Sequence, residues 1–279
     1  MNSLKRIIDF YIFSNIHVAL AGFCITKITL VKFGVLGNLT SLFVGLSIVI
    51  SYNFIRLYEI KTNRINWLKK WFFVYKKSLL ILTFLSIIGL IYLVFFTEFN
   101  QKSIYILFPF VFMTFFYVIP LLKVGKIEFS FRNFPFIKIF SIAIAWAGIT
   151  VFFPLLEAEY ALTTDAYIEF FERIFFIIAI TIPFDIRDVN TDPKSLKTLP
   201  QVFGVKVTKL IGLGLLFLFV VFEVFKTEIS FMETLTSLLI SIIAAIFLLF
   251  SNDQKSRYYT SFWVEAIPII WFILVILFL

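Results

Sequence analysis

Reactive residue types are nearly missing from this chain of 279 residues, and charged residues are scarce. Cys24 is the only cysteine and His17 the only histidine. An intramolecular disulfide is therefore impossible, and both His-rich metal sites and His-centred catalytic triads are excluded. Charged residues make up 15% of the chain, against roughly a quarter in soluble domains. A chain with so little charge lacks the surface of a soluble protein.

In place of charge, the chain carries apolar surface that lipid must cover. Hydrophobic residues make up 61% of it and phenylalanine alone occurs 40 times. A membrane-spanning helix needs about 20 mostly apolar residues, and helices satisfy their own backbone hydrogen bonds within lipid. Nine windows meet this condition: 14–35, 38–58, 78–97, 103–122, 136–155, 167–184, 207–225, 231–250 and 262–279. We predict an all-α polytopic membrane protein with about nine transmembrane helices, forming a single domain over residues 1–279.

The basic residues are distributed unevenly between the two sets of connections. Most lie in the same set as the N-terminus, whereas the opposite set contains Lys102 and Lys226 and is acidic around residues 156–165. The positive-inside rule places the N-terminus and the long loops in the cytoplasm. The net charge of +8 therefore reflects membrane topology, and no nucleic-acid partner is expected. We expect an integral protein of a bacterial inner (plasma) membrane. The first window, with Lys27 and Lys32, is the weakest.

The connector "INWLKKWFFVYKK" combines Trp67, Trp71 and Tyr75 with several lysines. Aromatic side chains beside basic residues are typical of helices that lie at the headgroup level. We predict an interfacial helix on the cytoplasmic surface here.

The segment "TIPFDIRDVNTDPKSLKTLPQVFG" concentrates acid at one end of an apolar window. Asp185, Asp188 and Asp192 are three and four residues apart. If the helix continues for two turns past Pro183, the three carboxylates share one face and repel one another. A cation would relieve this repulsion, and carboxylate oxygens suit Mg²⁺ together with substrate phosphates. In the alternative interpretation the segment is a solvated cytoplasmic loop, in which Asp188 or Asp192 pairs with Arg187 or Lys194.

The same segment resembles the second aspartate motif of the UbiA superfamily of intramembrane prenyltransferases. The likeness includes the three aspartates, Lys194, "KTLP" at 197–200 and Gly204. It implies a helical bundle whose central cavity opens to the cytoplasm, with the motif between the sixth and seventh of nine helices. A weaker likeness lies in "YVIPLLK", from Tyr117 to Lys123, which resembles the exit of the family's fourth helix.

The first aspartate motif of that family is degenerate in this chain. Asn53 matches its leading asparagine, but Phe54, Leu57 and Lys61 stand where aspartates are expected. A second metal ion would have too few ligands here. Arg56 lies on the same helix face as Asn53, and a fixed guanidinium group can neutralise a diphosphate in place of a metal. Alternatively, Arg56 extends to the interface or pairs with Glu59.

The resemblance implies a Mg²⁺-dependent enzyme that transfers a prenyl group from a prenyl diphosphate to an apolar or aromatic acceptor. Asp185, Asp188 and Asp192 are the candidate metal ligands and catalytic residues. The candidate substrate-binding residues are Asn53, Arg56, Tyr117, Lys123, Lys194 and Lys197. Tyr117 has the alternative role of an interfacial anchor. Two other functions stay open: a non-catalytic protein that binds isoprenoid lipid or scaffolds a biosynthetic complex, and a secondary transporter.

Overall fold

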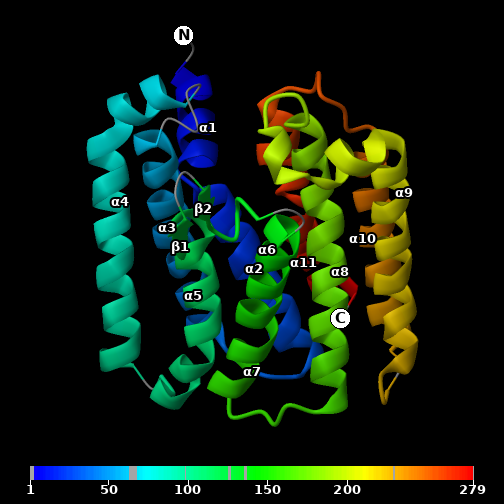
Figure 1. Cartoon of the computed structure of the whole chain (residues 1–279). Helices are drawn as coiled ribbons and strands as arrows, with labels where there is room; N and C mark the ends of the chain where they lie inside the picture. Colours follow the sequence, from blue (N-terminus) through cyan, green and yellow to red (C-terminus); the bar gives the residue numbers. More distant parts are fainter. Residues whose placement is uncertain are drawn as a thin grey trace.

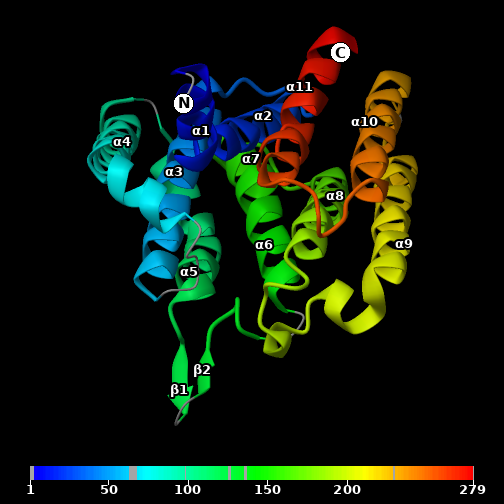
Figure 2. The ribbon, with the colours of Figure 1, turned by 90° about the horizontal axis from the view of Figure 1, so that it is seen from above.

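The computed structural model is almost entirely helical (Figure 1). It describes residues 3–62, 68–97, 99–124, 127–134, 137–228 and 230–278. The first half of the chain contains α1 (Ser3–Phe13), α2 (Ile16–Lys32), α3 (Asn38–Lys61), α4 (Lys69–Phe96), the 3₁₀ helix η1 (Gln101–Ile106) and α5 (Leu107–Val118). A short antiparallel hairpin follows, formed by β1 (Leu122–Val124) and β2 (Ile127–Phe129). The hairpin projects away from the helices in Figure 2.

The second half of the chain begins with one apolar helix in three parts. These are α6 (Ile137–Ala147), the π-helical turn η2 (Gly148–Phe152) and α7 (Phe153–Glu157). The remaining elements are α8 (Thr164–Arg187), η3 (Lys194–Leu196), α9 (Leu199–Phe222), η4 (Glu223–Phe225), α10 (Phe231–Leu249), the π-helical turn η5 (Tyr259–Val264) and α11 (Ile267–Phe278).

The helices are those of an integral membrane protein. Six are long and apolar enough to cross a bilayer, and a seventh span results if α1 and α2 are taken together. A bend of 54° separates α1 from α2, where Asn15 adopts the left-handed conformation that asparagine tolerates. By the same measure α5 is too short, and α8 carries too many charged residues within its length.

Packing between the helices closes into a ring. Along it, α2 packs on α3, α3 on α5, α5 on α6, α6 on α8, and α8 on α9. The ring is completed by contacts of α9 with α10, α10 with α11, and α11 with α2, while α4 packs against α3 (Figures 1 and 2). Segments far apart in the sequence therefore meet around a common interior.

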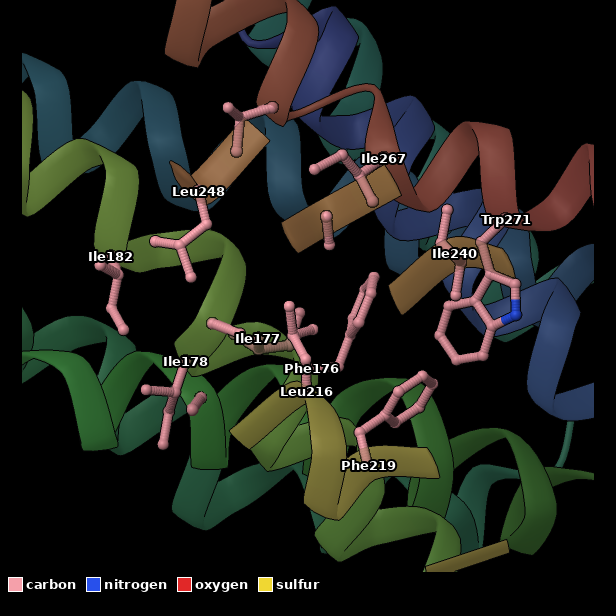
Figure 3. Close-up of a cluster of buried hydrophobic side chains, with 14 of the residues drawn as sticks. Phe176, Ile177, Ile178, Ile182, Leu216, Phe219, Ile240, Leu248, Ile267 and Trp271 are labelled. Atoms are coloured by element: carbon pink, nitrogen blue, oxygen red, sulfur yellow. The ribbon is translucent and has the colours of Figure 1, made fainter. Parts of the chain in front are cut away.

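The largest apolar core lies between α8 and the last three helices. Figure 3 shows Phe176 and Ile182 of α8 facing Phe219, Leu248 and Trp271. Phe176, Ile182, Phe219 and Trp271 are fully buried. Burying such side chains stabilises the fold by roughly 1.5–3 kcal/mol each where the alternative is water, and this core fixes the position of α8.

One sequence prediction is wrong in this part of the molecule. The segment around Trp71 and Tyr75 does not form a separate interfacial helix, because α4 runs without interruption from Lys69 to Phe96. Trp71 packs on Phe10 and Phe13 of α1. Trp67 lies outside the described residues. The aromatic residues of this segment therefore join α4 to the first helix.

Candidate functional site

The aspartate motif begins on a helix but does not stay on it. Helix α8 continues through Pro183 and ends at Arg187, so Asp185 lies in its last turn and Asp188 is its C-cap. The chain then turns, and the Asp192 N–H donates to the Asp188 carbonyl oxygen at 2.8 Å. The predicted helical face carrying all three acids is therefore wrong: the helix extends one turn past Pro183 instead of two.

Two of the three acids share one ammonium group. Lys138, at the start of α6, places its Nζ 2.7 Å from Asp185 Oδ1 and 3.2 Å from Asp192 Oδ2. Asp185 is buried, and the Lys138 side chain is 15% exposed. This lysine joins α6 to the end of α8 and to the loop that follows. Asp185 and Asp192, which the turn places on different elements, therefore meet at one ammonium group.

The third acid has a partner of its own. Arg187 donates from Nε and Nη2 to the two carboxylate oxygens of Asp188, at 2.8 and 2.5 Å. Arg187 also donates from Nη1 to the Thr260 hydroxyl of η5. A two-pronged pair of this kind is the strongest geometry that arginine forms with a carboxylate. We call Lys138, Asp185, Arg187, Asp188 and Asp192 the open cluster.

The open cluster borders a cavity of ≈ 590 Å³ inside the ring of helices. Asp188, Asp192 and Arg187 line it from the end of α8 and the following loop. Arg56 and Glu59 of α3 line the same cavity. Two segments that the sequence analysis linked only by resemblance therefore face one space.

Two further arginines complete the polar lining of the cavity. Arg132, between β2 and α6, forms an ion pair with Glu59 of α3. Arg257, in the loop before η5, also lines the cavity. Arg56 donates from Nη1 to the Phe13 carbonyl oxygen at 2.5 Å. The described lining thus draws arginines from four separate segments of the chain.

Burial and neighbouring charges shift the pKa values of the two loop arginines, Arg132 and Arg257. Burial lowers the pKa of Arg132, and the nearby carboxylates Asp192, Asp188 and Asp185 act in the opposite direction. Burial also lowers the pKa of Arg257, assisted by Arg187 and opposed by Asp188. Arginine stays protonated at physiological pH in such surroundings, so both groups remain fixed positive charges beside the aspartates.

Aromatic side chains also line the cavity. Trp146 of α6 donates from Nε1 to the Tyr52 hydroxyl of α3 at 3.2 Å. Beyond this pair lies a smaller pocket of ≈ 60 Å³, which shares Tyr52 and Trp146 with the larger cavity. Gly148 permits close packing nearby, since a Cβ there would lie 1.9 Å from the Phe110 ring. One space therefore carries both charged and aromatic side chains.

The other predicted substrate residues are placed differently. Tyr117 lines the cavity. Asn53 instead accepts from Asn15 at 2.7 Å and donates to Thr83 at 3.0 Å, which ties α3 to α2 and α4. Lys194 and Lys197 are exposed. The side chain of Lys123 lies outside the described residues.

The "KTLP" part of the motif has a local structural role. The Thr198 N–H donates to Gln201 Oε1 at 3.1 Å, closing the N-terminus of α9. Pro200 occupies the first turn, where its missing N–H costs nothing. Gln201 also donates to the Asp192 carbonyl oxygen at 3.0 Å. This segment therefore positions the loop that carries Asp192.

Sequence reasoning missed several residues of the site. Lys138, in the first turn of α6, and Arg132, before that helix, lie far along the chain from the aspartates, and local spacing does not connect them to the motif. Glu265 lines the cavity from the end of η5. A signal for Glu265 existed, because an ionisable residue within an apolar window indicates a functional position by default.

The resemblance implies magnesium, and the carboxylates can be tested for their fit to it. Mg²⁺ in proteins is held by one or two carboxylates that leave room for substrate oxygens. Here Asp185 and Asp192 converge on Lys138, and Asp188 converges on Arg187. Among the described residues, no group of three or more His, Cys, Asp or Glu side chains is placed to hold a metal ion. The arrangement does not fit an open carboxylate site, and the magnesium site stays a prediction.

In comparisons with known proteins, no family model, no curated protein and no solved structure matches this chain significantly.

Proposed function

We propose that this protein is an intramembrane prenyltransferase of the UbiA kind, which transfers a prenyl group from a prenyl diphosphate to an apolar or aromatic acceptor. One observation carries the proposal: Arg56, Asp188 and Asp192 line a single cavity, although they come from distant segments. That cavity carries both charged and aromatic side chains, as a substrate with a diphosphate head and an isoprenoid tail requires.

The arrangement of the helices supports a nine-span bundle. The six apolar helices and the bent pair α1–α2 account for seven crossings. Helix α5, extended by η1, and helix α8 take part in the same ring, and both would be spans in the proposed topology. The charged residues of the cavity would then face the cytoplasm of a bacterial inner membrane, with the N-terminus on the same side. Labelling of single introduced cysteines from either side of the membrane tests this orientation.

The chain's own residues have distinct parts in the proposed reaction. The cavity arginines hold the diphosphate, which leaves with the electron pair of the broken carbon–oxygen bond. Tyr52, Trp146 and Phe184 line the cavity, exclude water and offer ring faces to the allylic cation. The acceptor atom bonds to that carbon and loses a proton. Glu265, which lines the same cavity, accepts it.

Purified protein in lipid nanodiscs, incubated with a labelled prenyl diphosphate and a panel of aromatic and lipid acceptors, tests the proposal. We expect diphosphate release and a labelled lipid product, both reduced at least about tenfold by Arg56→Met, because a charge-assisted hydrogen bond to the leaving group is lost. Lys70→Met removes an exposed lysine of α4 and is the control. Absence of product with every acceptor would contradict the enzymatic proposal.

The second candidate is a non-catalytic protein that binds isoprenoid lipid. The observation that favours it is the replacement of the first-motif aspartates: Phe54 stacks on Phe115, and Lys61 is exposed. The same preparation distinguishes the two. Saturable binding of prenyl diphosphate without diphosphate release selects the second candidate.

A further inference from the structure

The position of Lys138 is unusual for an aspartate motif that resembles a metal site. Its ammonium group lies between carboxylates of two segments, at 2.7 Å from Asp185 and 3.2 Å from Asp192. A divalent cation that bridged the two carboxylates would have to occupy the position of this ammonium group. An ammonium group carries one fixed charge, donates three hydrogen bonds and cannot dissociate into solvent.

Each of the three acids thus already has a basic partner within the chain. Lys138 forms ion pairs with Asp185 and Asp192, and Arg187 forms one with Asp188. On the opposite wall, where the related motif would supply more carboxylates, Arg56 contributes a positive charge and hydrogen-bonds to a backbone carbonyl. Phe54, Leu57 and Lys61 stand at the aspartate positions of the first motif, and a basic residue has joined the acids at the second.

Buried acids without a counter-ion are costly, and so are buried ammonium groups without one. The open cluster lowers both costs, because each acid pairs with a covalently attached cation. A magnesium ion would have to displace Lys138 from Asp185, leaving an ammonium group that is mostly buried without its nearest partner. That displacement opposes metal binding.

We propose that Lys138 takes the structural place of a divalent cation in this site, so that the protein binds prenyl diphosphate without Mg²⁺. This inference rests on the proposed function, because it concerns the same ligand. The diphosphate is held by the guanidinium groups of Arg56, Arg132, Arg187 and Arg257. Lys138 pairs with Asp185 and Asp192 and so holds the loop after α8 in place. It is a positioning residue and does not line the cavity.

Equilibrium binding of labelled geranylgeranyl diphosphate to the protein in nanodiscs, in EDTA and in millimolar MgCl₂, tests the proposal. For the wild type we expect equal affinity in both buffers, to within about twofold. Lys138→Met frees Asp185 and Asp192, so its affinity in EDTA should fall by at least about tenfold and MgCl₂ should restore it. Lys138→Arg keeps the charge and should remain independent of Mg²⁺.

A second measurement does not depend on the diphosphate. Titration with Mn²⁺, followed by the loss of the free-ion electron paramagnetic resonance signal, reports metal binding directly. We expect Lys138→Met to acquire one site that the wild type lacks, and Asp185→Asn in the Lys138→Met background to remove it again.

The outcomes separate the two proposals. Wild-type binding that is at least tenfold weaker in EDTA, or a Mn²⁺ site already present in the wild type, overturns the metal-independent site and leaves the prenyltransferase proposal standing. No binding in either buffer overturns both. If Lys138→Met is recovered only as aggregated protein, the wild-type measurements in EDTA and with Mn²⁺ still decide.

Discussion

Helix α8 carries two groups of buried charge, and their comparison separates structural charge from functional charge. Near its N-terminal end, Glu169, Glu172 and Arg173 meet basic and acidic partners from other elements. Near its C-terminal end lies the open cluster. About 18 Å of helix separates Arg173 from Asp185, at 1.5 Å per residue. The apolar core in Figure 3 fills that interval.

The first group is sealed inside the protein. We call Lys32, Glu169, Glu172, Arg173, Glu223 and Lys226 the sealed cluster; their side chains are at most 7% exposed. It holds three acids and three bases.

Its hydrogen bonds and ring contacts are those of a structural network. Lys226 contacts Glu169, Glu172 and Glu223 at 2.7–2.9 Å. Lys32 and Arg173 both lie over the Trp271 ring, at 5.5 and 5.1 Å.

The two clusters teach that burial of charge alone does not indicate a site. Both are held together by ion pairs, and both involve α8. The sealed cluster satisfies its own charges and fastens α2 and the α9–α10 connection onto α8. The open cluster does the same for α6, but two of its acids and one of its bases also line a cavity. Access to the cavity, rather than the charges themselves, makes the second a candidate for binding.

The largest effect on stability is expected from a substitution that disrupts the sealed cluster. Glu169→Gln removes the acid shared by Lys32, Arg173 and Lys226 and leaves buried positive charge unmatched, so we expect a loss of about 3–5 kcal/mol in the free energy of unfolding. Equilibrium denaturation in mixed micelles measures it. Glu228→Gln, on an exposed loop acid, is the control. Equal stability of the two variants would show that the network does not hold α8.

A substitution in the open cluster should cause a smaller loss of stability together with weaker binding of the ligand. Asp185→Asn leaves Lys138 with Asp192, so the stability cost should be about 1–3 kcal/mol. Binding of prenyl diphosphate should nevertheless fall by at least about tenfold, because the loop that carries Asp188 and Asp192 shifts. Glu169→Gln, assayed at a temperature where it stays folded, should retain binding. If Glu169→Gln lost binding and Asp185→Asn retained it, the sealed cluster would be the binding site and the open cluster the structural one.

Salt should distinguish the clusters without mutation. Raising NaCl from 0.05 to 0.5 M screens charges that solvent reaches and affects buried pairs much less. We expect the affinity for prenyl diphosphate to fall several-fold while the unfolding midpoint changes little. Binding that is insensitive to salt would place the ligand away from the cavity arginines.

The smallest expected effect concerns the two lysines of the motif itself. Lys194 and Lys197 are exposed and do not line the cavity. The double variant Lys194→Gln with Lys197→Gln should change prenyl diphosphate affinity by less than about twofold. A loss as large as that of Arg56→Met would mean that the loop closes over the ligand and brings these lysines into the site.

Hydropathy predicted most of the helices, because lipid imposes a simple length and composition on them. The window at 231–250 matches α10, and the window at 38–58 matches most of α3. Hydropathy does not register partners, so the sealed cluster inside the window at 167–184 was not predicted. A single helix gives no indication that Lys32 and Lys226 would reach its acids.

The candidate site was predicted only in part, for a related reason. Local spacing identified Asp185, Asp188 and Asp192 and the helix face of Arg56. It placed the acids on one helix, whereas α8 ends at Arg187. Lys138 brings Asp185 and Asp192 together from a different helix, and such contacts depend on tertiary packing that spacing does not encode.

The central claim is that the cavity beside the open cluster binds a prenyl diphosphate. Equilibrium binding of labelled geranylgeranyl diphosphate to wild type, Arg187→Met and Lys70→Met in nanodiscs tests it most directly. The account predicts saturable binding to wild type and to Lys70→Met, and affinity at least about tenfold weaker for Arg187→Met. Equal affinity for all three proteins, or no saturable binding to any of them, would contradict it.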